Sequence, residues 1–433
     1  MKSKISINSN MSRLNRVLFF VFFALFFSSS KINAQTTTLR FAKLITGQGD
    51  VISDAVVIIE GNKIIKVDSG EKNILPNTTL IDLRPLIAIP GLIDVHTHIT
   101  YYWDKTSGTN PWASRLDPAT TVFLAQESAM KTLETGVTTI RDLGSSGGTD
   151  ISMRDLINRG AMKGPRMFVA GNGLHISRAR INPGNTTFDP GRADGVEEVI
   201  KVVRQELGSG VDWIKIYGST GSAQNVTGFQ TFTTEEMKAA VDIAHKAGKR
   251  VAVHSYGPDG CLSAVLAGAE SVEHATDVDK STFEEMVKRG TFYVPTVDHN
   301  RYYVDHREEY GYNSIIVKGL NNYIDRNFKS LQLAIKMNVK IAMGSDAVFT
   351  GFGENTRELR WLVKAGMTPG QALQTATING ADLLGKKNEL GAIAPGFFAD
   401  IVAVDGNPLD DIEVVINKVR WVMKDGKTVV DKR

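Results

Sequence analysis

Six residues of types that bind metal ions lie at or near the ends of apolar runs that are typical of strands. The first two, His96 and His98, end the run GLIDVHTH, and residues two apart on a strand point to the same side. Burying two polar rings on one side of an apolar strand gives no packing gain, whereas paired imidazoles bind metal ions well. The spacing therefore predicts that His96 and His98 are metal ligands.

A lysine, Lys215, lies inside the apolar run DWIKIYG, between Ile214 and Ile216. Burial of a charged amine is costly unless the amine is paired or neutral. One interpretation is a salt-bridged lysine in the core. The other is that the neutral amine takes up carbon dioxide and becomes a carbamate, an anionic oxygen ligand that can bridge two cations.

Three further candidates close later runs: His254 ends VAVH, His274 ends SVEH and Asp346 ends AMGSD. Each is weak by itself, because an aspartate after a strand is often only a helix cap. Together the six residues fall at the ends of five runs, as expected for one active site built by several strands.

The remaining histidines have weaker patterns. His245 lies in a helical pattern and is expected to be a solvated helix residue. His175, His299 and His306 follow the third and seventh runs, where a loop histidine can face the site or be exposed. The sequence leaves the roles of His175 and His299 open.

Eight apolar runs alternate with amphipathic helical segments across residues 89–389. One such segment begins with a capping-box pattern at Thr233 and Glu236 and closes at Gly248. Strands alternating with helices predict an α/β fold, specifically a (β/α)8 TIM-type barrel, whose active site lies at the carboxyl ends of its strands. A doubly wound open sheet is the competing fold. The runs are GLIDVHTH, GVTTIRDLG, RMFVAG, DWIKIYG, RVAVHSYG, ESVEHATD, TFYVPTV and KIAMGSDA.

The two ends of the mature chain have a different pattern. Residues 35–88 and 390–433 contain short β-type runs separated by glycine, asparagine and Asp-Gly turn signals. We expect both segments to build one small β-sandwich-like domain beside the barrel.

Residues 1–34 have the pattern of a secretory signal peptide. Basic residues precede the apolar run 17–27, which is too short to cross a bilayer and leads to the small residue Ala34. We expect cleavage after export to the periplasm or medium, with no stable membrane anchor. Removing this segment takes away five basic and no acidic residues, which changes the formal net charge from +3 to −2.

A nearly neutral mature chain gives no electrostatic reason to expect nucleic acid as a partner. Its single cysteine, Cys261, cannot form an intramolecular disulfide and is expected to be a small buried apolar residue. Stability must therefore come from the core and from bound metal. The sequence does not decide whether the chain forms a homo-oligomer.

The motifs resemble the amidohydrolase superfamily, in particular its imidazolonepropionase-like and Xaa-Pro dipeptidase (prolidase-type) branch, which has a carboxylated lysine. The resemblance covers nearly the whole mature chain. It includes IPGLIDVHTH, GVTTIRDLG, WIKIYG, VAVHSYG, SVEHATD, GSDA, TPGQALQTATINGADLLG and GAIAPGFFADIVAVDGNP.

The resemblance implies a binuclear hydrolase of amide bonds. One divalent ion would be held by His96, His98 and Asp346, and the other by His254 and His274. Lys215, carboxylated by carbon dioxide, would bridge them, and zinc is the expected metal. The ions would lower the pKa of a bridging water, while Asp346 would take up its proton and pass it to the leaving nitrogen.

The substrate is less well specified. Relatives often carry a TGGHG-like turn after the third strand, whereas this chain has GNGLHISRARINPGN from Gly171. Aromatic and basic loops, including Arg178 and Arg180, suit a small molecule with an apolar ring and a carboxylate, such as a dipeptide or an N-acyl amino acid. They fit equally well as ordinary surface loops whose tyrosines pack on the barrel. The alternative enzyme opens a cyclic amide or a lactone. A non-catalytic binding protein would have lost ligand positions, yet all six remain.

Overall fold

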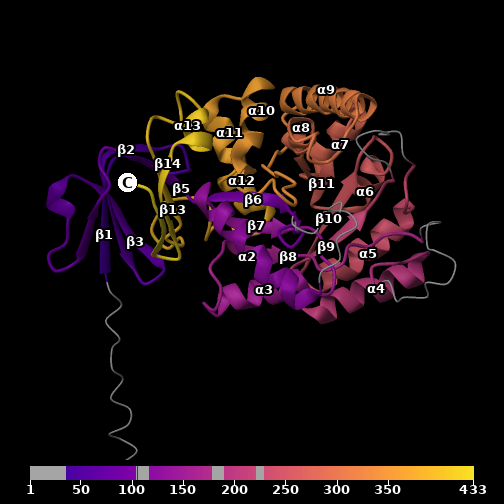
Figure 1. The fold of residues 1–433 in the computed structure, drawn as a ribbon, viewed down its shortest axis with the longest axis horizontal. Helices are drawn as coiled ribbons and strands as arrows, with labels where there is room; N and C mark the ends of the chain where they lie inside the picture. The colour runs from indigo at the N-terminus through magenta and orange to yellow at the C-terminus, as the bar shows by residue number, and fades with distance from the viewer. Residues whose placement is uncertain (1–35, 104, 106–116, 178–189, 221–228) are drawn as a thin grey trace, which may run out of the picture.

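The computed structural model describes residues 36–103, 105, 117–177, 190–220 and 229–433 (Figure 1). The signal peptide expected at 1–34 and the loop residues Arg178 and Arg180 lie outside the described residues, so export stays a prediction. Within the described part of the chain, no helix is long and apolar enough to span a membrane.

Strands from both ends of the described chain form one eight-stranded sheet, at the left of Figure 1. The carboxyl-terminal strands join the amino-terminal ones where β13 pairs antiparallel with β5. The fully buried side chains of Leu39, Phe41 and Trp421 lie in its core. The strands are β1 (Thr36–Ile45), β2 (Val51–Glu60), β3 (Lys63–Ser69), β4 (Thr79–Asp82), β5 (Ile87–Pro90), β13 (Ile401–Val404), β14 (Val419–Lys424) and β15 (Lys427–Asp431), with a 3-10 turn at Glu71–Asn73.

The central region contains two parallel sheets. The first is formed by β6 (Leu92–Thr97), β7 (Val137–Asp142) and β8 (Arg166–Val169). The second is formed by β9 (Trp213–Tyr217), β10 (Arg250–Ser255), β11 (Ser271–His274) and β12 (Phe292–Val294). These seven strands lie within the first seven predicted runs, and with the intervening helices they give an α/β fold.

The eighth predicted run, KIAMGSDA, does not form a regular strand. Only Ile341 and Ala347 make isolated parallel bridges, to Tyr293 of β12 and Thr97 of β6. The run ends in a left-handed residue, Asp346, with φ of 51°. The prediction of an eighth regular strand was therefore wrong, and the described residues show two parallel sheets in place of one continuous barrel sheet.

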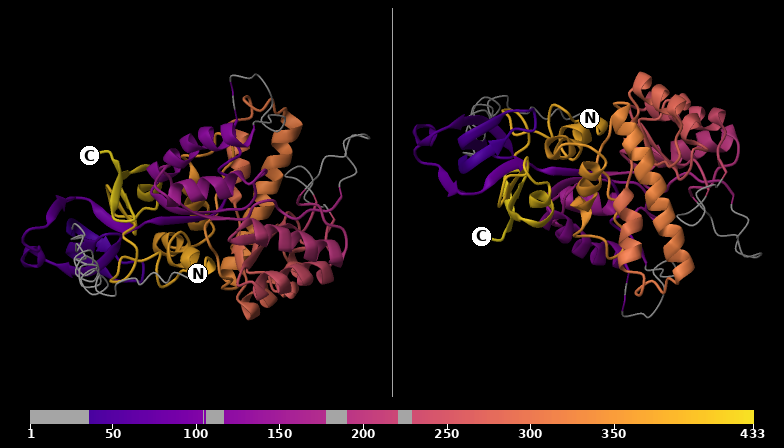
Figure 2. Two further views of the ribbon diagram at one scale, coloured as in Figure 1. Left: turned by 90° about the horizontal axis from the view of Figure 1, so that it is seen from below. Right: turned by 90° about the horizontal axis from the view of Figure 1, so that it is seen from above.

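Helices cover these sheets on the outside, and the long α9 runs along one side of the molecule (Figure 2). The predicted capping box is confirmed at the start of α5, where Thr233 and Glu236 exchange side-chain and backbone hydrogen bonds. The helices are α2 (Pro118–Glu134), α3 (Thr149–Asn158), α4 (Val196–Ser209), α5 (Thr234–Lys246), α6 (Cys261–Ala267), α7 (Lys280–Arg289), α8 (Val297–Asp305), α9 (Ser314–Lys336), α10 (Glu358–Lys364), α11 (Pro369–Thr375), α12 (Ile378–Leu383) and α13 (Glu413–Asn417), with a 3-10 turn at Asn355–Arg357.

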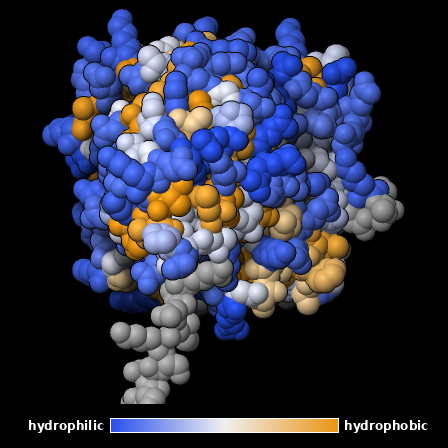
Figure 3. Space-filling view, turned by 90° about the vertical axis from the view of Figure 1, so that its left-hand side faces the viewer, coloured by the Kyte–Doolittle hydropathy of each residue, from blue (hydrophilic) through white to orange (hydrophobic). Residues whose placement is uncertain are grey.

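The face that ends the molecule on the side of the eight-stranded sheet is largely hydrophilic, with separate hydrophobic patches (Figure 3). Exposed apolar side chains of this sheet region include Val51, Ile65 and Leu80. Isolated exposed apolar residues are normal on soluble proteins. The single cysteine, Cys261, is free and buried as expected.

The eight-stranded sheet and the β6–β8 sheet are held together where the chain passes from β5 to β6. A Cβ on Gly91 would lie 2.2 Å from the Thr138 hydroxyl oxygen, so only glycine fits this contact. Beside it, Arg166 of β8 donates to the Asp400 carboxylate at 2.5 Å and also pairs with Asp425. The guanidinium stacks 4.5 Å from the centre of the Phe398 ring.

This contact predicts a loss of stability in Arg166→Met, which keeps an apolar stem but leaves buried Asp400 without its cation. Because Lys424 still pairs with Asp425, we expect the free energy of unfolding to fall by about 3 kcal/mol, the low end of values for broken buried pairs. Urea denaturation followed by circular dichroism measures this change. Arg204→Met on the exposed side of α4 is the control; equal midpoints for the two variants would contradict the prediction.

Candidate metal centre

The His-x-His pair extends from the carboxyl end of β6. His96 lies in the strand and His98 one residue past its end, and both side chains are buried. Their ring centroids are 5.5 Å apart. The structure thus brings the pair to one side of the strand, as the spacing predicted.

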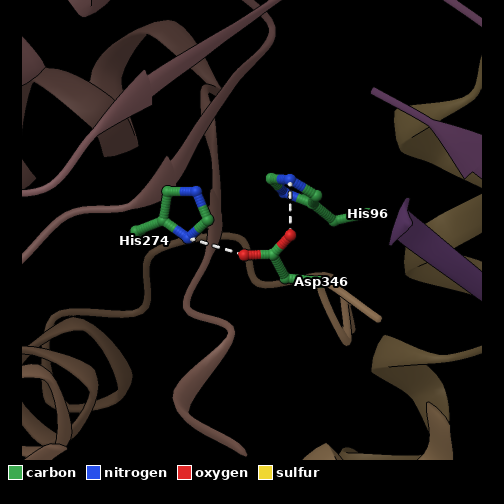
Figure 4. Close-up of side chains that lie close together, drawn as sticks. All are labelled: His96, His274 and Asp346. Carbon is green, nitrogen blue, oxygen red and sulfur yellow. Dashed lines mark ion pairs between the residues drawn. The ribbon is translucent and has the colours of Figure 1, made fainter. Parts of the chain in front are cut away.

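Asp346 lies between these imidazoles and those of later elements (Figure 4). Its Oδ1 is 3.5 Å from His96 Nε2 and 3.4 Å from His98 Nε2. Its Oδ2 is 3.9 Å from His274 Nδ1. The ligand atoms of His96, His274 and Asp346 all lie within 4.8 Å of one another, so these three buried residues could hold one metal ion.

The ring nitrogens that face Asp346 are hydrogen-bond acceptors. His96 Nδ1 lies 2.8 Å from a Glu273 carboxylate oxygen, and His98 Nδ1 lies 3.0 Å from the Gly144 carbonyl oxygen. Both partners accept, so each Nδ1 carries the proton and each Nε2 presents a lone pair. Two lone pairs and a carboxylate oxygen therefore face one another, an arrangement that a cation between them would stabilise.

His254 and His274 form a second pair, with ring centroids 4.6 Å apart. His274 also stands close to His96, with centroids 4.9 Å apart. The left-handed backbone of His274, with φ of 70°, directs its ring, and Nδ1 lies 2.7 Å from the Thr296 hydroxyl. The β10 and β11 histidines thus reach the same centre as those of β6.

Lys215 lies in β9 with 1% of its surface exposed. Its Nζ has no hydrogen-bond partner among the described residues and lies 5.4 Å from the centre of the Tyr217 ring. Burial lowers the pKa of the amine to about 8, although the charges of Glu273 and Asp346 oppose this. The salt-bridged alternative is therefore wrong, because the amine has no partner in the described structure.

Burial also keeps the imidazoles neutral. It lowers the pKa of His96, His254 and His274 well below the usual value, and the nearby Lys215 charge adds to the effect. The pKa of His98 is lowered by burial, partly offset by Asp346. A neutral imidazole is the form that binds a metal ion, so these rings are in the state that coordination requires.

A buried ion pair that the sequence analysis missed holds His96 in place. One carboxylate oxygen of Glu273, in β11, accepts a hydrogen bond from His96 Nδ1, and the other accepts from Arg141 Nη2 at 2.8 Å. Arg141 is fully buried and stacks 4.4 Å from the centre of the Trp213 ring. A signal was present, since SVEH and TTIRD each place a charge inside an apolar strand.

A second missed acid, Asp94, supports the segment before Asp346. Its carboxylate accepts from the Ser345 backbone at 2.9 Å and from the Asn355 side chain at 3.0 Å. It also accepts from the His96 backbone, and burial raises its pKa to about 6. Asp94 therefore ties β6 to the turn that carries Asp346.

Of the histidines whose roles were open, His299 reaches the centre. It lies in α8, where its Nδ1 donates to the Asp346 carbonyl oxygen at 2.8 Å and its Nε2 is 3.4 Å from Asp346 Oδ2. His175 Nδ1 lies 3.0 Å from the Gly173 carbonyl oxygen, and His306 pairs with Glu309. His299 thus places a third imidazole Nε2 beside Asp346.

Residues 87–429 match the model of the amidohydrolase family. The chain belongs to this family. It is 30% identical to ochratoxinase of Aspergillus niger over 92% of this chain and 88% of that protein. It is 33% identical to a solved Xaa-Pro dipeptidase with bound methionine, with a TM-score of 0.82 over 91% of this chain and 99% of that one.

Imidazolonepropionase of Thermoanaerobacter pseudethanolicus is 23% identical over 86% of this chain and 89% of that protein. The predicted resemblance to the amidohydrolases is therefore confirmed. Membership in this family identifies the chain as an enzyme, a hydrolase that acts on carbon–nitrogen bonds.

The contact between Glu273 and His96 predicts weaker metal binding in Glu273→Gln. The amide keeps the shape but loses the charge that aligns and polarises the imidazole, so zinc affinity should fall about 10- to 100-fold. Competition with a coloured chelator measures it. Glu284→Gln, exposed on α7, is the matched control. Unchanged affinity in a Glu273→Gln protein with wild-type circular dichroism would contradict this role.

Proposed function

We propose that this amidohydrolase hydrolyses amide bonds of dipeptides or N-acyl amino acids with two divalent metal ions. The proposal rests mainly on two imidazole lone pairs that face the same carboxylate oxygen, Oδ1 of Asp346. His96 Nε2 and His98 Nε2 face Asp346 Oδ1 at 3.5 and 3.4 Å, while their own protons are used elsewhere. Such a cluster is repulsive unless a cation lies among its atoms.

The residues fit metal ions in two further respects. Two buried polar atoms, His96 Nε2 and Lys215 Nζ, have no hydrogen-bond partner among the described residues. Buried polar groups are almost always satisfied, so each of these atoms calls for a ligand. Imidazole nitrogens with carboxylate-type oxygens are typical of zinc in hydrolases.

The residues that would hold the ions come from five elements. We assign one ion to His96, His98 and Asp346 and the other to His254 and His274. Lys215, carboxylated by carbon dioxide, would supply oxygens to both. Divalent ions bound there would supply Lewis acidity and activation of water near neutral pH.

Asp346 is positioned to move protons during hydrolysis. One carboxylate oxygen faces His96 and His98, and the other faces His299, so the group reaches both sides of the centre. In the proposed reaction it accepts the proton of the attacking water and delivers it to the leaving amide nitrogen. His299, bonded to the Asp346 carbonyl, keeps this carboxylate in place.

Barrel closure is part of the proposal, since it would bring the strand ends to one mouth. Three isolated parallel bridges support it, because they join the segments between the two parallel sheets. Leu174 bridges Ile216 of β9, and the eighth run bridges β12 and β6 through Ile341 and Ala347. Single bridges of this kind continue the order expected of a (β/α)8 barrel.

Two observations support the substrate class. The named relatives include an ochratoxinase and a Xaa-Pro dipeptidase, both similar over about nine-tenths of this chain. Aromatic rings also gather beside the centre: Tyr303 is 4.9 Å from His299, and Tyr310 is 5.0 Å from Tyr303 and 5.1 Å from Trp103 between ring centroids. Such a wall suits an apolar side chain.

The second candidate is hydrolysis of a cyclic amide or a lactone. The similarity to imidazolonepropionase favours it, and the same residues would serve that reaction. A substrate panel distinguishes the two candidates. We expect the mature protein to contain about two zinc equivalents and to cleave dipeptides or N-acyl amino acids faster than cyclic amides and lactones.

The panel is run after incubation with zinc and bicarbonate, with metal measured by mass spectrometry. Faster opening of the cyclic substrates would favour the second candidate. Absence of bound metal together with no hydrolysis of any substrate would overturn the proposal.

The role of Asp346 predicts a specific defect in Asp346→Asn. Asparagine tolerates the left-handed backbone and keeps the shape, so folding should be retained. Loss of the proton acceptor should lower kcat by about 10²- to 10⁴-fold, while most of the metal stays bound. Asp242→Asn, exposed on α5, serves as the control. Turnover near that of the control would remove Asp346 from the mechanism.

A further inference from the structure

The first turn of α8 is held by a carboxylate from another helix. Glu358, the first residue of α10, is 1% exposed, and its two oxygens accept from the backbone amides of Val297 at 3.0 Å and Asp298 at 2.8 Å. The first amides of a helix have no partner within that helix, and the helix dipole favours a negative charge there. Glu358 therefore acts as a cap of α8 supplied by α10.

The residue in the capping position of α8 uses its hydroxyl elsewhere. Thr296 directly precedes the helix, yet its side chain makes no capping hydrogen bond to it. Its Oγ1 lies 2.7 Å from His274 Nδ1. A threonine in this position typically accepts from an amide of its own helix. Because this hydroxyl contacts His274, the amides at the start of α8 depend on Glu358.

The backbone of Thr296 also needs support. Its φ of 49° is left-handed, which is rare for a side chain that is branched at Cβ. Such a conformation persists only where the surrounding contacts fix it. The two hydrogen bonds of Glu358 fix the two residues that directly follow Thr296. Glu358 is thus placed to keep the Thr296 hydroxyl at His274.

The same turn carries His299, on the other side of the two capped amides. His299 Nδ1 donates to the Asp346 carbonyl oxygen at 2.8 Å, and its Nε2 lies 3.4 Å from Asp346 Oδ2. A shift of this turn would move both nitrogens relative to Asp346. Contacts with two of the proposed metal ligands, His274 and Asp346, therefore depend on one turn of helix.

Two neighbours of Glu358 hold the same turn through the Asp298 side chain. Trp361 Nε1 donates to Asp298 Oδ1 at 2.8 Å. Arg357 Nε lies 3.1 Å from Asp298 Oδ2. The segment 357–361 therefore contacts both the backbone and a side chain of the first turn of α8, and Glu358 provides the backbone contacts.

We propose that Glu358 is a positioning residue of the metal centre that acts through the first turn of α8. By holding this turn, it keeps Thr296 against His274. It also keeps His299 against Asp346. The inference rests on the proposed function, because it takes His274 and Asp346 as metal ligands.

Two backbone donors at one side chain require a carboxylate. Both Glu358 oxygens accept, whereas glutamine has one acceptor oxygen and an NH2 group that would face a backbone N–H. Burial raises the pKa of Glu358 to about 8, and the two backbone hydrogen bonds oppose this shift because they favour the ionised form. Glu358→Gln therefore keeps the size of the side chain but removes one of the two hydrogen bonds.

The test compares two imidazole protons in the mature protein by NMR, with isotope-labelled histidine. His299 Nδ1 and His98 Nδ1 are both buried and both donate to a backbone carbonyl oxygen, which protects their protons from exchange with water. In Glu358→Gln we expect the His299 proton to exchange about 10-fold faster. The His98 proton should change by less than about twofold, because its partner, Gly144, follows β7 and does not belong to α8.

Glu206→Gln is the matched control. Glu206 is a buried glutamate of α4 whose two oxygens accept from the backbone and side-chain amides of Asn172. This substitution should leave the His299 proton unchanged. Trp361→Phe is a second variant of α10, which removes the donor to Asp298 without altering a buried charge. It tests the same turn even if Glu358→Gln fails to fold, and it should speed exchange at His299 about threefold.

Steady-state kinetics separates positioning from substrate binding. In the zinc-loaded Glu358→Gln protein we expect kcat for the best amide substrate to fall about 10- to 100-fold, because small displacements at a reacting centre are costly. KM should stay within about twofold, since Glu358 is placed behind α8 and acts on the ligands, not on the substrate. Metal content is measured in the same samples.

Three outcomes would overturn the inference. They are equal acceleration of exchange at His299 and His98, no change at His299 in the folded α10 variants, and wild-type kcat in Glu358→Gln. Equal acceleration would show a general loosening of the fold. The proposed function fails by a different result, absence of metal and of any amide hydrolysis. Proton exchange can be measured with or without metal, so the two failures are distinguishable.

Discussion

Burial of polar side chains around Asp346 is the constraint on which the rest of this structure depends. Imidazoles from the end of β6, from β11 and from α8 surround one carboxylate, and each lone pair directed at it adds repulsion. Desolvation alone would make such a cluster costly. Neutral histidines lower this desolvation cost. The hydrogen bonds of His96 Nδ1 and His98 Nδ1 to fixed partners hold the two rings in one orientation. The Nε2 lone pairs of His96 and His98 then face an Asp346 oxygen, and a cation among these atoms would remove their repulsion.

The groups behind the ligands explain how separate strands converge so closely. Glu273 connects His96 to Arg141, and therefore links β11, β6 and β7 through one buried carboxylate. Asp94 does the same for β6 and the turn at Ser345. The oxygens of both acids are used in these hydrogen bonds and are not free to compete for a metal ion. Glu273 also places a negative charge beside the His96 ring, which strengthens that imidazole as a ligand.

Sequence patterns predicted the strands and the ligand types because both depend on local spacing. They could not predict the backbone at His274 and Asp346. Strand alternation would place His274 on the side opposite Glu273, yet its φ of 70° turns the ring toward the centre, where Glu273 also points. The eighth run likewise ends in a left-handed residue, Asp346, and it pairs only through isolated bridges. Glu273 was missed because its partners, His96 and Arg141, are far away in sequence.

The division between strands and helices also explains why family membership identifies the reaction class more readily than the substrate. The candidate ligands are fixed by strand ends and by buried acids that tolerate little change. The aromatic rings beside them come from α8, α9 and the loop before α2, where a side chain can change without disturbing a strand ladder.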